Sequence, residues 1–120
     1  MKPALVLVDH GSRRAEANSA LEELAALVRA ADPERCVHVA HMELAPPELE
    51  SALGACAAEG ARSVTVVPVF LGPGRHTHED IPRLVREAEA KHPELSVRVA
   101  PPLGPHPLLA ELVLTRAAEV

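Results

Sequence analysis

Two histidines and one glutamate occupy positions where a reactive metal could be held. His10 and His76 each lie in the loop after a short continuous apolar run, and Glu43 lies after a shorter, more mixed one. Imidazole and carboxylate groups are suitable ligands for borderline divalent metals such as Co²⁺, Ni²⁺, Fe²⁺ and Zn²⁺. Three or fewer protein ligands leave coordination positions open for water or a substrate. Each residue alone is typical of a polar loop, so the prediction of a metal site rests on their meeting in the fold.

Positively charged side chains stand on the same loops. Arg13 and Arg14 lie on the first loop, and Arg75 lies on the third. Guanidinium groups pair well with carboxylates and phosphates, so we expect an anionic ligand in this otherwise acidic chain. A solvated surface is the alternative interpretation for each arginine. Ser12 and Asn18 are expected either to cap the following helix, the commoner use of serine, or to touch the ligand.

The other histidines carry weaker signals. His78 could supply a third imidazole, although the start of a helix favours a solvent-facing or capping role. His41 and His106 stand at junctions between elements, where they could line a pocket without binding the metal. His38 is expected on the face of an edge strand, and His92 at a helix end, where partial positive charge is favourable.

Apolar periodicity predicts strands that alternate with helices four times. The continuous apolar runs are typical of strands covered on both faces, and the expected strands are 4–8, 36–40, 64–70 and 96–100. Apolar residues at helical spacing between and after them predict helices whose stripes begin at Leu21, Leu49, Ile81 and Leu109.

This alternation predicts right-handed βαβ units and a doubly wound, four-stranded parallel sheet with helices on both faces. The two most apolar runs should be central, while His38 and Arg98 mark the other two as edges, which gives the order 2-1-3-4. Ligands in such sheets bind beyond the carboxyl ends of the strands, where the winding direction reverses. Here that point lies just after Val8 and just after Phe70.

Composition bounds the class of protein. The chain has 120 residues, of which 48% are hydrophobic and 24% charged, so we expect one domain over residues 1–120. A net charge of −5 and 1% aromatic residues argue against nucleic-acid binding. No apolar run approaches the ~18 residues of a membrane span.

The start of the chain and its two cysteines indicate the cellular compartment. The start of the chain shows no small-residue cleavage site, so we expect no signal peptide and a cytoplasmic location. Cys36 and Cys56 lack metal-site or disulfide-framework spacing, so buried free thiols are expected.

At these same loops the chain resembles the sirohydrochlorin metal chelatases, the class II chelatases of tetrapyrrole synthesis. The matching stretches cover nearly the whole chain and are LVDHGSRRAEAN (7–18), HMELAPPELESAL (41–53), VVPVFLGPGRHTHEDIP (66–82) and PPLGPHPLL (101–109). The most specific of them are HGSR and FLGPGRH followed by DIP. His78 has no fixed counterpart in the family pattern, and a third metal-binding imidazole stays open.

The resemblance implies roles for individual residues. His10 would bind the metal and accept a proton, His76 would be the second metal ligand, and Glu43 would face the macrocycle and assist either step. Ser12 and Arg13 would contact the tetrapyrrole, which would be lined by Leu71, Gly72, Pro73, Gly74, Arg75 and His76. The divalent metal (Co²⁺, Ni²⁺ or Fe²⁺) would be a substrate and no organic cofactor is implied. Short chains of this family pair as homodimers, with the tetrapyrrole in the cleft.

Two other functions use similar residues. A non-catalytic carrier of metal or tetrapyrrole would employ the same histidines. Phosphohistidine phosphatases also place His-Gly after the first strand, but the carboxylate of Asp9 beside His10 would repel a phosphoryl group. For a chelatase, activity should fall below about pH 6, because doubly protonated imidazole neither binds a metal nor accepts a proton.

Overall fold

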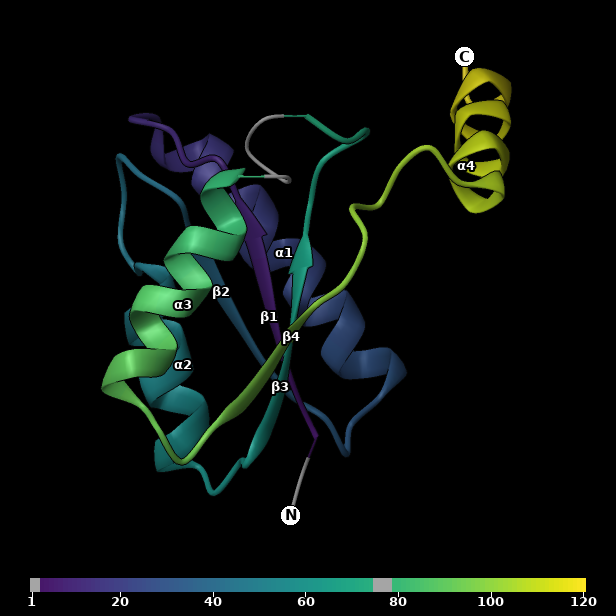
Figure 1. Cartoon of the computed structure of the whole chain (residues 1–120). Helices are drawn as coiled ribbons and strands as arrows, with labels where there is room; N and C mark the ends of the chain where they lie inside the picture. Colours follow the sequence, from purple (N-terminus) through teal and green to yellow (C-terminus); the bar gives the residue numbers. More distant parts are fainter. Residues whose placement is uncertain (1–2, 75–78) are drawn as a thin grey trace.

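The computed structural model describes residues 3–74 and 79–120, in which strands and helices alternate (Figure 1). The strands are β1 (Ala4–Asp9), β2 (Cys36–His41), β3 (Ser63–Pro68) and β4 (Ser96–Val99). The helices are α1 (Ala15–Ala31), α2 (Leu49–Ala58), α3 (Ile81–Lys91) and α4 (Pro107–Ala118). Four positions predicted or considered for the site or its loop, residues 75–78, lie outside the described ranges, and they include Arg75, His76 and His78.

The strands form one parallel sheet in the order β2-β1-β3-β4, which confirms the predicted topology. Val6 and Val8 of β1 and Val64 and Val66 of β3 are fully buried, as expected for central strands. The edge strands are those that a polar residue interrupts in the sequence. Because β1 is followed by β2 on one side and then by β3 on the other, the winding reverses between β1 and β3.

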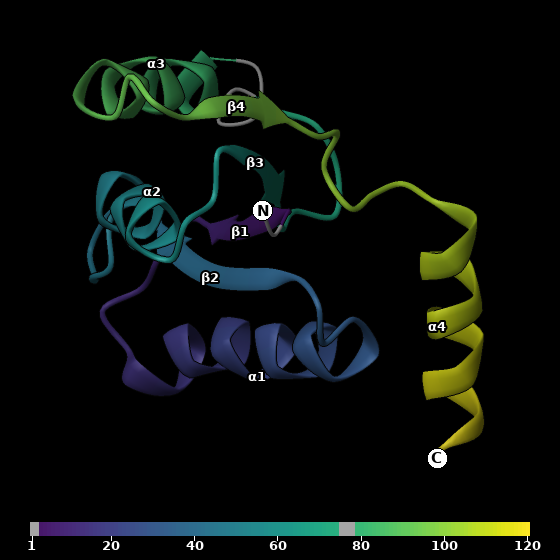
Figure 2. The ribbon, with the colours of Figure 1, turned by 90° about the horizontal axis from the view of Figure 1, so that it is seen from below.

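Helices cover both faces of the sheet, as predicted. Figure 2 shows α2 and α3 on one side and α1 on the other. The larger core lies between the sheet and α2 and α3, and its fully buried side chains include Leu53 and Ile81. A smaller core joins α1 to the sheet through Leu21 and Ala25. The apolar stripes therefore face the sheet, as their helical spacing predicts.

The strand ends differ from the predicted ones. β1 and β2 each continue one residue further, to Asp9 and His41, while β3 ends at Pro68 and not at Phe70. The parallel register explains the difference: β3 leaves β1 after the pair Val8↔Pro68, whereas β1 and β2 stay paired to their last residues. β4 also ends one residue early, at Val99.

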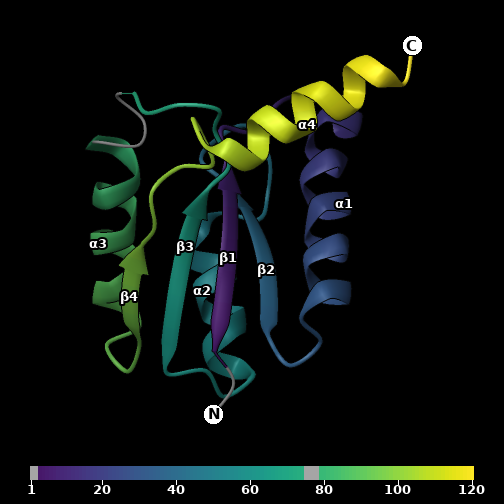
Figure 3. The same ribbon diagram turned by 90° about the vertical axis from the view of Figure 1, so that its right-hand side faces the viewer.

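α4 stands away from the rest of the chain. Figures 1 and 2 both place it beside the sheet at the end of an extended linker, and none of its residues is buried. Figure 3 looks onto the sheet from the side on which α4 lies, with α2 behind the strands. Within residues 3–74 and 79–120, every helix is too short or too polar to cross a bilayer.

Candidate active site

His10 and Glu43 meet at the carboxyl ends of β1 and β2. The Nε2 atom of His10 lies 3.0 Å from Oε1 of Glu43, and the two side chains are 42% and 57% exposed. Backbone hydrogen bonds extend the strand pairing into both loops: the amide of Glu43 donates to the carbonyl of His10 at 3.1 Å, and that of Met42 donates to Asp9 at 2.9 Å. The predicted pair of groups is thus held together by backbone that continues the sheet.

Gly11 permits this close approach. Its φ of +95° is a conformation that residues with a side chain rarely adopt, and a Cβ atom there would lie 1.9 Å from the carbonyl oxygen of Glu43. Only a residue without Cβ lets the two loops touch. The glycine after His10 therefore contributes to the site because its lack of a side chain lets the two loops approach each other.

Beneath this pair lies a contact that sequence reasoning missed. His41 Nδ1 lies 2.5 Å from the Asp9 carboxylate, and His41 is almost fully buried. The two residues are the last register pair of β1 and β2. The backbone amide of His41 also donates to the carbonyl of Pro47 at 2.8 Å. His41 thus joins the strand ends below the site, and it does not line an open pocket.

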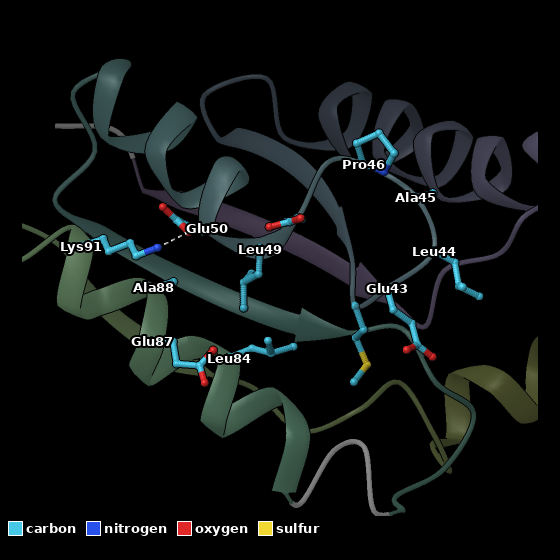
Figure 4. Close-up of a pocket in the computed structure, with 12 residues that line it drawn as sticks. Glu43, Leu44, Ala45, Pro46, Leu49, Glu50, Leu84, Glu87, Ala88 and Lys91 are labelled. Carbon is cyan, nitrogen blue, oxygen red and sulfur yellow. Dashed lines mark hydrogen bonds and ion pairs between the residues drawn. The ribbon is translucent and has the colours of Figure 1, made fainter.

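Two cavities adjoin Glu43. The smaller, about 100 Å³, is lined by His10, Met42, Glu43, Asp80, Arg83 and Leu84. The larger, about 550 Å³, runs between α2 and α3 and shares Met42, Glu43 and Leu84 (Figure 4). Figure 4 shows Glu43 at one end of the larger cavity, with the ion pair between Glu50 and Lys91 at the other.

The start of α3 contributes residues that the sequence analysis did not select. Asp80 and Arg83 line the smaller cavity, and an Nη2 atom of Arg83 lies 3.9 Å from Oδ1 of Asp80. An acidic residue before a helix also suits helix stabilisation, so the residue type of Asp80 does not by itself indicate a role in the site.

Ser12 and Asn18 shape the first loop. The backbone amide of Ser12 donates to the Asn18 side chain at 2.9 Å, and the Ser12 hydroxyl accepts from the amide of Arg14 at 3.0 Å. Both residues therefore build the turn before α1, but neither caps the helix as predicted, because the N-cap position is Arg14, whose side chain makes no capping hydrogen bond. Arg13 and Arg14 are exposed at this rim.

The loop after β3 is described as far as Gly74. Leu71, Pro73 and Gly74 are exposed, and Gly72 is half-buried. The amide of Gly104 donates to the carbonyl of Phe70 at 3.1 Å, and a Cβ atom at Gly104 would lie 2.1 Å from the carbonyl oxygen of Leu71. The linker before α4 thus supports this loop. Whether His76 faces His10 stays a prediction.

Histidines away from the site have other partners. Nδ1 of His106 accepts from the amide of Leu108 at 3.0 Å and caps α4. His92 ends α3, as expected. His38 lies on the edge strand, with Nε2 2.7 Å from the Glu59 carboxylate.

An open parallel sheet with an imidazole–carboxylate pair at the carboxyl ends of its strands, beside the switch point, defines an α/β domain suited to hold a ligand there. The sequence model of the CbiX family matches residues 4–120, and the chain belongs to that family. Its relatives include a sirohydrochlorin ferrochelatase of Arabidopsis thaliana chloroplasts, 44% identical over 93% of this chain and 50% of the relative. A sirohydrochlorin cobaltochelatase of Methanopyrus kandleri is 32% identical over 97% of this chain and 95% of its own.

Solved structures agree with this assignment. A CbiX protein of Marinobacter aquaeolei superposes with a TM-score of 0.84 at 32% identity, over 98% of this chain and 95% of the other. The sirohydrochlorin chelatase SirB of Bacillus subtilis, in complex with cobalt, gives a TM-score of 0.90 at 27% identity. That match covers 100% of this chain but 51% of SirB, so the chain spans about half the length of some relatives and nearly all of others.

Proposed function

We propose that this protein is a metal chelatase that inserts a divalent cation, Co²⁺ or else Ni²⁺ or Fe²⁺, into sirohydrochlorin. The observation that supports it most directly is the 3.0 Å contact between His10 Nε2 and Glu43 Oε1 at the carboxyl ends of β1 and β2, beside the switch point of the sheet. The sirohydrochlorin chelatases among its relatives provide the substrate class. We also propose that residues 1–120 act as one domain, located in the cytoplasm, without nucleic acid or membrane as a partner.

Metal insertion exchanges one cation for the N–H protons of the macrocycle. His10, with His76, would hold the cation, and fewer than four protein ligands leave positions for the ring nitrogens. Because a carboxylate only accepts hydrogen bonds, the contact with Glu43 requires a proton on His10 Nε2. A cation would bind Nε2 of the tautomer that carries its proton on Nδ1, so the Nε2 proton shifts to Nδ1 by exchange with solvent, and the Glu43 carboxylate is left beside the ion. Glu43 is then available to bind the cation or to accept a ring proton.

This exchange changes no oxidation state. A cation enters, protons leave, and the protein's imidazole and carboxylate supply both the ligands and the base. We therefore propose that no organic cofactor takes part and that the metal is a substrate.

The macrocycle is best placed on the arginine side of the rim. The larger cavity is lined by acidic side chains, including Glu48, Glu50 and Glu87, of which Glu50 is paired with Lys91. Such a lining repels a polycarboxylate such as sirohydrochlorin, whereas Arg13 and Arg14 attract one. We propose that the ring rests against Ser12, Arg13 and the loop 71–76, and that the acidic cavity faces the approaching cation.

We further propose that two copies of the chain form a homodimer through α4. Leu108, Leu112, Val113 and Leu114 of this helix are 46–71% exposed, and an apolar cavity of about 400 Å³ lies at its base. Exposed apolar helix faces mark contact surfaces. A second copy is the fitting occupant because SirB holds about twice the length of this chain in one molecule. Pairing would supply the second half.

The test is insertion into metal-free sirohydrochlorin by substoichiometric protein, followed by the absorbance change of the macrocycle. Many turnovers per protein molecule, lost in His10→Ala, support the proposal. A spectrum that shifts once in proportion to protein, with no acceleration over the free reaction, identifies a carrier and overturns it. Comparing Co²⁺, Ni²⁺ and Fe²⁺ in the same assay ranks the metals.

A further inference from the structure

A second group of metal-binding side chains lies at the opposite end of the sheet. Cys36 and His38 belong to β2 and Cys56 to α2, and their sulfur and nitrogen atoms all lie within 4.8 Å of one another. Residues two apart on a strand face the same side, so both β2 side chains point toward α2. Both cysteines are free and buried. The grouping is therefore a product of the packing of β2 against α2.

The Glu59 carboxylate contacts two members of this group. The thiol of Cys36 donates to Oε1 of Glu59 at 2.9 Å, and Nε2 of His38 lies 2.7 Å from Oε2 of the same carboxylate. Glu59 ends α2, three residues after Cys56 and thus on the same helix face. Four side chains from one strand and one helix end converge here.

We propose that Cys36, His38 and Cys56 bind one Zn²⁺ ion and that the Glu59 carboxylate completes a tetrahedral site. Two thiolates and one imidazole form a ligand set that zinc favours, with Zn–S bonds of about 2.3 Å and Zn–N bonds of about 2.0 Å. Those bond lengths put neighbouring ligand atoms about 3.5 Å apart. The ligand atoms of the existing group lie within 4.8 Å of one another, so they must approach by shifts on the order of 1 Å to reach these separations.

The four side chains differ in burial, and this difference defines the side from which an ion can approach. Cys56 and Cys36 are 0% and 7% exposed, whereas the side chains of His38 and Glu59 are 27% and 53% exposed. Burial, together with the neighbouring Cys36, raises the pKa of the Cys56 thiol to about 12. Zinc binds cysteine as the thiolate, so its uptake would displace the thiol protons to solvent.

This site is separate from the one at His10. Cys36 is the first residue of β2 and His41 the last, so the two sites lie roughly 16 Å apart along the strand. Four protein ligands leave no open position, which is typical of a structural zinc. The ion would join the edge strand β2 to the end of α2, and it would take no part in metal insertion.

Co²⁺ distinguishes the two sites because only thiolate ligands give an intense near-ultraviolet charge-transfer band. Reduced, chelator-treated protein is titrated with Co²⁺ under nitrogen. We expect the band in the unaltered protein and in His10→Ala, and its loss in Cys36→Ser. Insertion activity should be present in the unaltered protein, lost in His10→Ala and retained in Cys36→Ser. If the unaltered protein shows the band but no insertion activity, the proposed function fails and the zinc site stands.

Two milder variants keep the proposal testable if Cys36→Ser folds poorly. His38→Gln should weaken Zn²⁺ binding at least tenfold, and Glu59→Gln should weaken it about tenfold to a hundredfold, as expected for a residue that ligates or orients the ligands. Zn²⁺ should raise the melting temperature of the unaltered protein more than that of either variant. Absence of the band in reduced, folded protein, or equal Zn²⁺ affinity in the parent and His38→Gln, would overturn the proposal. A Cys36–Cys56 disulfide with no zinc uptake after reduction would do the same.

Discussion

Asp9 and His41 form a partly buried side-chain contact, 2.5 Å between Oδ1 and Nδ1, at the last register pair of β1 and β2. His10 and Glu43 follow these two residues by one and two positions, so the contact defines the strand ends from which the proposed metal-binding groups extend. Asp9 and His41 are positioning residues, because their own polar atoms face each other beneath the rim.

Asp9→Ala should therefore both destabilise the protein and impair insertion. The buried His41 imidazole loses its partner, which costs about 1–3 kcal/mol in unfolding free energy. Denaturant unfolding measures that loss, and the insertion assay should show a larger fall in kcat than change in KM. Asp9→Asn keeps an oxygen that accepts from Nδ1 and should recover most of the stability. Equal losses in both variants would contradict this role.

Gly11→Ala should damage the site through shape. The added methyl would lie 1.9 Å from the carbonyl oxygen of Glu43, so the two loops must separate, and we expect at least a tenfold fall in insertion. Gly60→Ala is the matched control. It shares a positive φ, +94°, but nothing lies within 4 Å of its Cβ position. Both variants should lose about 1–2 kcal/mol to backbone strain, and only Gly11→Ala should lose activity.

The sheet order could be predicted because strands that are buried on both faces have continuously apolar sequences. The central strands are continuous apolar runs, and the polar residues His38 and Arg98 indicate the two edge strands. From that order the meeting of His10 and Glu43 follows, because adjacent parallel strands end at the same rim. The resemblance to chelatases added the identity of the substrate, which no pattern of burial contains.

Contacts that depend on strand ends and helix packing could not be predicted. The expected first and second strands ended at Val8 and Ala40, each one residue before the observed end, so the Asp9–His41 pair was left out. The buried free cysteines were predicted correctly. Their proximity, however, depends on the rotation of α2 against β2, which apolar spacing alone defines too coarsely.

His10→Ala should abolish insertion, with a loss of at least a hundredfold, because it removes the group proposed as metal ligand and proton acceptor. Glu43→Gln keeps the shape but not the charge and should cost about tenfold or more. Since the two side chains touch, the double variant should lose less than the product of the two effects. His92→Ala, at the far end of α3, should retain activity. Full multiplicative losses in the double variant would show that the two residues act independently.

Leu112→Glu on α4 should dissociate the proposed homodimer. This leucine is 46% exposed in the single chain, so a charge there costs the monomer little, while a charge buried against a second copy is costly. Sedimentation should shift from dimer to monomer, and insertion should fall if the cleft between copies holds the macrocycle. Leu27→Glu is the matched control, because Leu27 on α1 is 69% exposed outside the proposed contact and should leave the dimer intact. An unaltered chain that sediments as a monomer at every concentration would refute the pairing. Dissociation by Leu27→Glu as well would place the contact on α1.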